Sequence, residues 1–321
     1  MPNYNKLTLG RKASELGFAR DAFEKMNRLT EILQYIHSNE DLKTYLALKG
    51  GTAINMTFFN LPRLSVDIDF DFDMNLSKEQ TSEKREHISG VLERYMANEG
   101  YVLKGTSKKT HILDSFVFAY TNAAGNSDNI KIEVNYILRC HILPSVEVMT
   151  RTDDVFPSFE VRTLSPTEIC ASKIVALTQR GAARDLFDIN NIVLSGMFKD
   201  KETSALRKCA VFYLALAGDS GTQSFDLANM NKITENKIHT DLRQMLRQSE
   251  RFNLQAAKDC ISKFLLNELV LKDNENEFLE QFRIGNYKPQ LLFDDDEIIK
   301  RIENHPMAMW RLRNIRDKQE Q

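Results

Sequence analysis

The chain has 321 residues, of which 42% are hydrophobic and 27% are charged, as is usual for a soluble globular protein of one large or two ordinary domains. Its 43 lysines and arginines nearly balance its 45 aspartates and glutamates, which excludes a protein that binds nucleic acid through a global basic field. No apolar run is long enough to cross a bilayer and residues 1–12 lack a signal-peptide core, so we expect a cytoplasmic protein.

A glycine pair follows the first predicted elements. Apolar residues at helical spacing in residues 13–37 predict one or two amphipathic helices, and residues 45–48 predict a short strand or a helix end. Gly50, Gly51 and Thr52 then precede an apolar run that is suited to a helix. Glycines let the backbone approach a ligand closely, and the N–H groups that open a helix attract phosphate. An ordinary turn that starts a helix is the alternative interpretation.

The next segment alternates acidic and apolar residues with the period of a strand. Its apolar members are predicted to enter a core: Val66, Ile68, Phe70 and Phe72. Its acidic members lie on the other face: Asp67, Asp69, Asp71 and Asp73. Adjacent like charges cost free energy unless a cation neutralises them, and carboxylates of this kind suit Mg²⁺, with Mn²⁺ as a substitute. The solvated face of an edge strand is the alternative, whereas an EF-hand is excluded because Phe72 stands where that loop needs glycine.

Strands dominate the following part of the chain. A capping box at Ser77 predicts a helix over residues 77–98, and a strand is expected at 101–104. Residues 111–121 and 130–138 predict a hairpin, in which Glu133 lies on the polar face. From the local pattern alone, a solvated strand residue is the favoured interpretation of Glu133, and a functional residue is the alternative. Residues 145–151 and 159–162 are expected to add edge strands.

The pattern becomes almost wholly helical after Leu164. Ser165 to Glu168 combine an N-cap residue, a proline and an acidic residue, which predicts a helix start. Lys173 flanks the apolar stripe of that helix, and Asp185 and Asp188 share a face of the next one. Surface ion pairs are the alternative interpretation of these charges. Further helices are predicted over residues 201–216, 224–245, 253–271 and 297–316.

The basic C-terminal region holds the only tryptophan, Trp310. Arg311, Arg313 and Arg316 follow it on the last predicted helix. Such a helix can hold an RNA backbone, and an ordinary solvated helix end is the alternative.

Taken together, the motifs resemble a known family. LKGGTA at 48–53, RLSVDIDF at 63–70, KIEVNY at 131–136 and RDLFD at 184–188 are similar to the motifs of the AbiEii/AbiGii-type nucleotidyltransferase toxins. These belong to the DNA polymerase β-like nucleotidyltransferase superfamily. The resemblance implies an α+β fold, with a mixed-sheet nucleotidyltransferase lobe and N-terminal helices at 1–164. A helical lobe at 165–321 would complete the active-site cleft.

The resemblance also implies roles for individual residues. Metal ligands and catalytic groups would be Asp67, Asp69 and Glu133, with Lys173 and Asp185 as further catalytic groups. Nucleotide contacts would come from Gly50, Gly51, Thr52, Arg63, Ser65 and Lys173. Asp71 and Asp73 are expected to lie off the metal site, because the strand carries them away from the glycine turn.

The implied reaction is transfer of a nucleoside monophosphate from an NTP to an acceptor hydroxyl, with Mg²⁺ as cofactor. In this family the acceptor is expected to be the tRNA acceptor end, and the protein would be the toxin of a toxin–antitoxin or phage-defence pair with a cognate antitoxin. Two alternatives remain from the sequence: a nucleotide-binding protein without transfer activity, and a transferase that modifies a small molecule such as an aminoglycoside.

Overall fold

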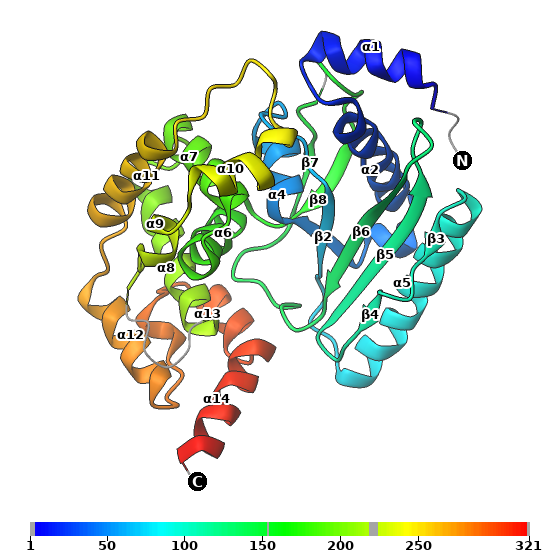
Figure 1. Ribbon diagram of the computed structural model, residues 1–321. Coiled ribbons are helices and arrows are strands. Elements are labelled where there is room, and N and C mark those ends of the chain that lie inside the picture. The colour runs from blue at the N-terminus through cyan, green and yellow to red at the C-terminus, as the bar shows by residue number, and fades with distance from the viewer. Residues whose placement is uncertain (1–3, 153, 218–223, 320–321) are drawn as a thin grey trace. The chain divides into compact units, whose positions relative to one another are not determined.

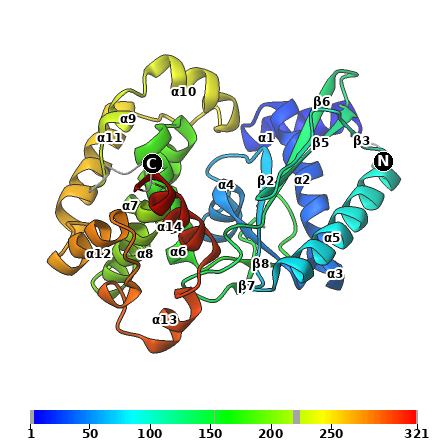
Figure 2. The same ribbon diagram turned by 90° about the horizontal axis from the view of Figure 1, so that it is seen from below.

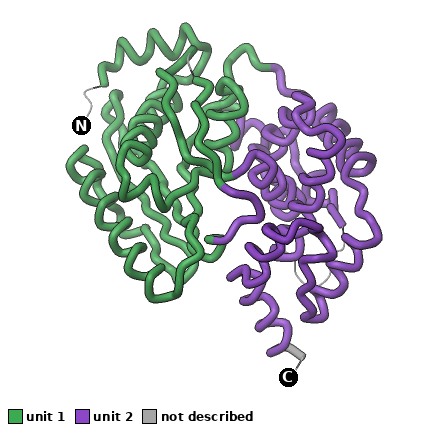
Figure 3. Tube along the Cα trace, turned by 180° about the vertical axis from the view of Figure 1, so that it is seen from behind, with its two compact units in different colours: residues 1–139, 145–164, 243–250 green, residues 140–144, 165–242, 251–321 purple. Residues whose placement is uncertain are grey.

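The computed structural model describes residues 4–152, 154–217 and 224–319. The chain forms two compact units, shown in green and purple in Figure 3. Unit 1 comprises residues 1–139, 145–164 and 243–250, and unit 2 comprises residues 140–144, 165–242 and 251–321. The sequence placed one boundary after Leu164. The chain passes from unit 1 to unit 2 at this point. In addition, segment 140–144 belongs to unit 2 although its neighbours in the chain belong to unit 1, and segment 243–250 belongs to unit 1 although its neighbours belong to unit 2.

Unit 1 is built on a mixed eight-stranded sheet with the order β3-β5-β6-β2-β1-β8-β7, to which β4 adds beside β5. The strands are β1 Leu46–Lys49, β2 Asp67–Phe72, β3 Val102–Leu103, β4 Lys108–Lys109, β5 Leu113–Thr121, β6 Ser127–Asn135, β7 Val146–Met149 and β8 Glu160–Thr163. β2 pairs with β6 in parallel and with β1 in antiparallel orientation, while β5 and β6 form the expected hairpin. Of the two expected edge strands, only β7 lies at an edge, because β8 is held between β1 and β7.

One face of this sheet is apolar and is covered by two long helices, α2 (Arg20–Ser38) and α5 (Lys78–Asn98) (Figures 1 and 2). The buried residues of the central strands alternate with polar ones, as the sequence predicts. They are Ile68, Phe70, Phe72, Ile130, Ile132 and Val134, each fully buried. Val66 differs from the prediction: it precedes β2 and is only half-buried. The expected capping box of Ser77 and Gln80 is present at the start of α5.

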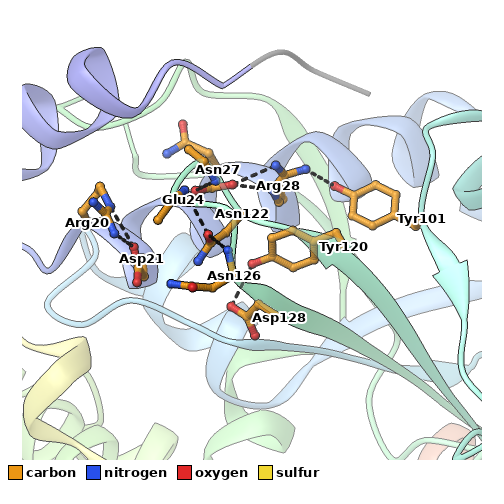
Figure 4. Close-up of polar contacts among 12 residues, drawn as sticks. Arg20, Asp21, Glu24, Asn27, Arg28, Tyr101, Tyr120, Asn122, Asn126 and Asp128 are labelled. Atoms are coloured by element: carbon orange, nitrogen blue, oxygen red, sulfur yellow. Dashed lines mark hydrogen bonds and ion pairs between the residues drawn. The ribbon is translucent and has the colours of Figure 1, made fainter.

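A buried ionic cluster attaches α2 to the hairpin (Figure 4). Arg28 lies between the rings of Tyr4 and Tyr120, at 4.4 and 4.3 Å from their centroids, and donates to Glu24. The other carboxylate oxygen of Glu24 accepts from the backbone N–H of Ala123 in the hairpin turn. The arginine is only 2% exposed, and a buried charge is costly unless it is compensated. This carboxylate and the aromatic faces provide that compensation.

The remaining helices of unit 1 are shorter. They are α1 Lys6–Leu16, α3 Glu40–Lys43, α4 Gly50–Ala53 and the π-helical turn Ile54–Phe58 that continues α4. Of the one or two helices expected over residues 13–37, two are present, and the first already begins at Lys6.

Unit 2 is helical among its described residues. Its helices are α6 Pro166–Arg180, α7 Ala183–Ser195, α8 Lys201–Ala217, α9 Ala228–Asn231, α10 Glu235–Asp241, α11 Leu254–Lys263, α12 Asp273–Arg283, α13 Asp296–Ile302 and α14 Pro306–Gln319. Two predictions were wrong in detail. The single helix expected over 224–245 is broken into short pieces, since Thr234 caps α10 and starts a new helix. The helix expected over 297–316 is divided where Pro306 begins α14.

Ser165 precedes α6 as expected, but its side chain makes no cap hydrogen bond. Glu168 does not cap the helix either. Its carboxylate is fully buried and accepts hydrogen bonds from the backbone N–H groups of Ile142 and Leu143 and from the hydroxyl of Tyr213. This acidic residue therefore ties segment 140–144 to unit 2, a tertiary role that helix-start patterns do not reveal.

The α+β class and the mixed sheet predicted from the sequence are confirmed. Among the described residues, no helix combines the length and the apolar composition that crossing a membrane would need.

Candidate active site

Three acidic residues of the motifs lie on the polar face of two adjacent strands. In the parallel pairing of β2 and β6, Asp69 is the register partner of Glu133, and Asp67 is the partner of Lys131. Register partners in a sheet point to the same face, as do residues two apart in one strand. The carboxylates of Asp67, Asp69 and Glu133 therefore belong to one surface of the sheet, opposite the face that α2 and α5 cover.

The glycine turn meets this surface at Asp69. Gly50 follows β1 directly and adopts a left-handed backbone conformation, with φ of +70°. A Cβ atom at this position would lie 2.8 Å from Oδ2 of Asp69, closer than side chains approach one another. The backbone conformation is strained for any residue that has a side chain, and a Cβ here would also force the carboxylate of Asp69 to move. The helix that opens at Gly50 thus starts against the acidic row, with its first N–H groups at the same end of the strand.

Two buried hydroxyls fasten the turn to the acidic strand. Thr52 is fully buried; its Oγ1 donates to the carbonyl oxygen of Asp67 at 2.5 Å and lies 2.6 Å from Oγ of Ser65. Ser65 is 4% exposed. The two side chains thus contact each other and the backbone of Asp67, and the nucleotide contacts expected of Thr52 and Ser65 stay a prediction. Their geometry favours a positioning role.

Arg63 is similarly buried. Its side chain is 2% exposed, and its Nη1 donates to the carbonyl oxygen of the neighbouring Leu64 at 3.1 Å. Its backbone forms an isolated bridge with Leu246, and Leu64 donates its N–H to Met245. The segment 243–250 therefore supports the residues that lead into β2. The contact with a triphosphate that the resemblance implies for Arg63 stays a prediction.

The outer aspartates of the row have basic partners. Lys49 forms an ion pair with Asp71, and Nη2 of Arg162 lies 2.6 Å from Oδ2 of Asp73. Asp71 is buried to 2% exposure. The expectation that these two residues stand apart from a metal site is consistent with their neutralisation by protein cations.

Glu133 has a basic neighbour of its own. Nζ of Lys131, two residues earlier on the same strand, lies 2.7 Å from Oε1 of Glu133. Among the residues that the structure describes, no three His, Cys, Asp or Glu side chains are already grouped to hold a metal ion. The donor chemistry nevertheless fits Mg²⁺, since carboxylate oxygens from adjacent strands share one face and Gly50 brings the backbone of the turn close to Asp69.

The charged residues predicted in unit 2 form a second cluster. Lys173 of α6 is 7% exposed, and its Nζ lies 2.8 Å from Oδ1 of Asp185 and 2.9 Å from Oδ2 of Asp188, both on α7. Arg180 contributes a second cation to Asp185, at 2.7 Å from Nε. Burial alone raises the pKa of Asp185, but Lys173 and Arg180 outweigh it and hold that pKa below its ordinary value.

The cluster of Lys173, Asp185 and Asp188 is therefore an ionic contact between two helices. The sequence indicated that Asp185 and Asp188 share a helix face, and the structure shows that Lys173 is their common partner. It did not indicate Arg180, whose spacing of five residues from Asp185 crosses the turn between α6 and α7. Nor did the sequence assign a partner to Lys131 or Lys49. Both lysines lie on strands beside the acidic row, at positions of the period-two pattern.

Comparisons with known proteins agree with this architecture. A family model described as "Nucleotidyl transferase AbiEii toxin, Type IV TA system" matches residues 31–265. Among solved structures, the chain is similar to MenT4, a nucleotidyltransferase toxin from Mycobacterium tuberculosis H37Rv, with 19% sequence identity and a TM-score of 0.63. This similarity covers 96% of the present chain and 99% of MenT4, and it concerns the fold. No curated protein matches the sequence.

Proposed function

Because the chain belongs to the AbiEii nucleotidyl transferase toxin family of type IV toxin–antitoxin systems, as its motifs predicted, we propose that it transfers a nucleoside monophosphate from an NTP to an acceptor hydroxyl. The observation that carries this proposal is the meeting of Gly50 with Asp69, whose register partner is Glu133. A helix start that attracts phosphate and a row of carboxylates are the two components that polyphosphate chemistry requires.

The backbone N–H groups of Gly50, Gly51 and Thr52 are proposed to hold the terminal phosphates of the NTP. Gly50 makes this possible, because a side chain there would collide with Asp69. Thr52 and Ser65 act on the reaction indirectly: their hydroxyls fix the distance between the turn and the backbone of Asp67. Arg63 is buried in the same segment, and on the family resemblance it is proposed, with Ser65, as a further nucleotide contact.

Asp67, Asp69 and Glu133 are proposed to hold Mg²⁺, which when bound would neutralise the triphosphate and stabilise the attacking and leaving oxygens. In the reaction, the acceptor oxygen forms a bond to the α-phosphorus while the bond from that phosphorus to the bridging oxygen of the β-phosphate breaks. Pyrophosphate leaves, and the hydroxyl proton passes to a base, a role for which Glu133 is the candidate.

Lys173 and Asp185 are proposed to contribute through nucleotide binding, as the family resemblance implies. The ion pairs of Lys173 with Asp185 and Asp188 support an arrangement in which the carboxylates orient the lysine. An ammonium held by two carboxylates has a fixed position, which lowers the entropic cost of contacting a phosphate.

We propose the tRNA acceptor end as the acceptor, on the family resemblance alone. A cognate antitoxin is implied by membership of a toxin–antitoxin family. A role in phage defence is proposed on the same basis as the tRNA acceptor.

Incubation of the purified protein with α-labelled NTPs, Mg²⁺ and total RNA tests the proposal. We expect label on tRNA that is lost in Asp67→Asn and Asp69→Asn but kept in Asp73→Asn, a matched control whose carboxylate is paired with Arg162. Label in a small-molecule product would show that the acceptor is this small molecule and not tRNA. Nucleotide binding without any labelled product would refute the transfer reaction.

A further inference from the structure

The ion pair between Lys131 and Glu133 places a cation inside the acidic row. The two residues are neighbours on the exposed face of β6, and their side chains are 41% and 25% exposed. The parallel register sets Lys131 opposite Asp67 and Glu133 opposite Asp69. Lys131 therefore has carboxylates beside it along its own strand and across the adjacent strand.

The other side of β6 offers the lysine no competing partner of opposite charge. In the pairing with β5, Ser115 faces Glu133 and Val117 faces Lys131. Serine and valine carry no charge, so the charged register neighbours of Lys131 lie on β2, and its ion-pair partner is Glu133. A cation in this position lowers the repulsion among the three carboxylates.

We infer that Lys131 is an internal counter-ion that competes with divalent metal for Glu133. This inference rests on the proposed function, since it takes Asp67, Asp69 and Glu133 as the metal ligands. In the free protein the ammonium neutralises Glu133. A metal ion that engages Glu133 has to displace Lys131, so the lysine weakens metal binding until substrate phosphates add their own affinity for the metal.

Mn²⁺ binding without nucleotide provides the test, measured by the loss of the free-ion EPR signal. Removing the competing cation in Lys131→Met should tighten Mn²⁺ binding by about threefold to tenfold, because an ion pair is no longer broken and a positive charge no longer repels the metal. Lys131→Arg keeps the charge and should bind like the wild type. The gain should vanish in the Glu133→Gln background, since the lysine then has no carboxylate to occupy.

Lys25→Met is the matched control. Lys25 forms an ion pair with Asp128 at 2.9 Å. Asp128 lies on the same strand as Glu133 but at odd separation, so it points to the opposite face. The control removes the same charge from the same unit and should leave Mn²⁺ affinity unchanged. An equal gain in Lys25→Met would reduce the effect to net charge and overturn the inference.

The two levels of the proposal fail differently. If Asp67→Asn combined with Asp69→Asn leaves Mn²⁺ binding intact, or if the wild type binds none in the presence of NTP, the proposed metal site is wrong. If that double variant abolishes binding while Lys131→Met binds no more tightly than wild type, the metal site stands and the counter-ion role is refuted. Thermal unfolding of each variant verifies that it is folded.

Discussion

The carboxylate of Asp69 occupies the space that a side chain at Gly50 would need. The gap of 2.8 Å from a Cβ at Gly50 to Oδ2 of Asp69 joins two motifs that lie 19 positions apart in the sequence. Glycine is required there for its φ of +70° and also for this approach. The glycine turn and the acidic strand are thus in direct contact.

Gly50→Ala is therefore expected to abolish nucleotidyl transfer. Its left-handed backbone costs roughly 1–2 kcal/mol for a residue with a Cβ, and the collision with Asp69 adds to that cost. Gly125→Ala is the matched control, because Gly125 has a φ of +88° but nothing within 4 Å of an added Cβ. Chemical denaturation and the labelling assay should show a similar backbone cost in both variants, with activity lost only in Gly50→Ala. Equal activity in the two would contradict the contact with Asp69.

Thr52→Val should lower both stability and activity. The substitution preserves shape but leaves the carbonyl of Asp67 and the hydroxyl of Ser65 without their buried partner, at a cost of about 1–3 kcal/mol. Thr52→Ser retains the hydroxyl and should retain most of the activity. Thr57→Val serves as a control, because Thr57 donates only to the helix carbonyl of Ala53. If Thr52→Val is as active as Thr52→Ser, the hydroxyl does not position Asp67.

Lys173→Met should strongly destabilise unit 2. It removes the ammonium that both buried carboxylates, Asp185 and Asp188, contact, and breaking a buried ion pair in this way costs roughly 3–5 kcal/mol. The triple variant Lys173→Met, Asp185→Asn, Asp188→Asn should recover part of the stability while remaining inactive. Full recovery of activity in the triple variant would show that the lysine has a structural role alone.

Asp185 should stabilise the fold down to acidic pH. Its pKa in the folded protein is held below its ordinary value of 3.8, so its contribution is complete above about pH 4 and is lost as the pH falls through the folded pKa. Asp185→Asn should therefore be less stable than wild type between pH 5 and 8, with the difference narrowing below pH 4. Urea unfolding of both proteins across this pH range measures the difference in their free energies of unfolding. A difference that stays constant down to pH 2 would contradict the ionised, paired state.

His305 should produce a separate loss of stability at milder acidity. Its Nδ1 accepts the N–H of Ala308 at 3.3 Å, and burial lowers its pKa from 6.5 to about 4. The unfolded chain takes up this proton first, so stability should fall by about 3 kcal/mol as the pH drops from 6.5 to 4. His305→Asn keeps a hydrogen-bond acceptor at the start of α14 without a titratable ring. The stability of this variant should not show this fall between pH 6.5 and 4. A fall as large as that of the wild type would assign the pH dependence to another group.

The sequence by itself determined the local structures of this protein. The period-two alternation of residues 67–72 predicted β2 and the apolar face that α2 and α5 cover, because burial of alternate side chains leaves little choice of register. The capping box at Ser77 and the proline at 166 likewise fixed helix starts, since caps act within one turn. The motifs were sufficient to identify the family.

Tertiary structure alone decided which charged groups meet. Lys131 and Glu133 pair on one strand, Asp69 faces both Glu133 and Gly50, and Lys173 joins two carboxylates of the next helix. Spacing places a side chain on a face, but it does not specify which strand lies beside that face or which cation arrives there. The same limit applies to the burial of Arg63 and Thr52, because burial depends on contacts with residues distant in sequence, such as Leu246 beside Arg63.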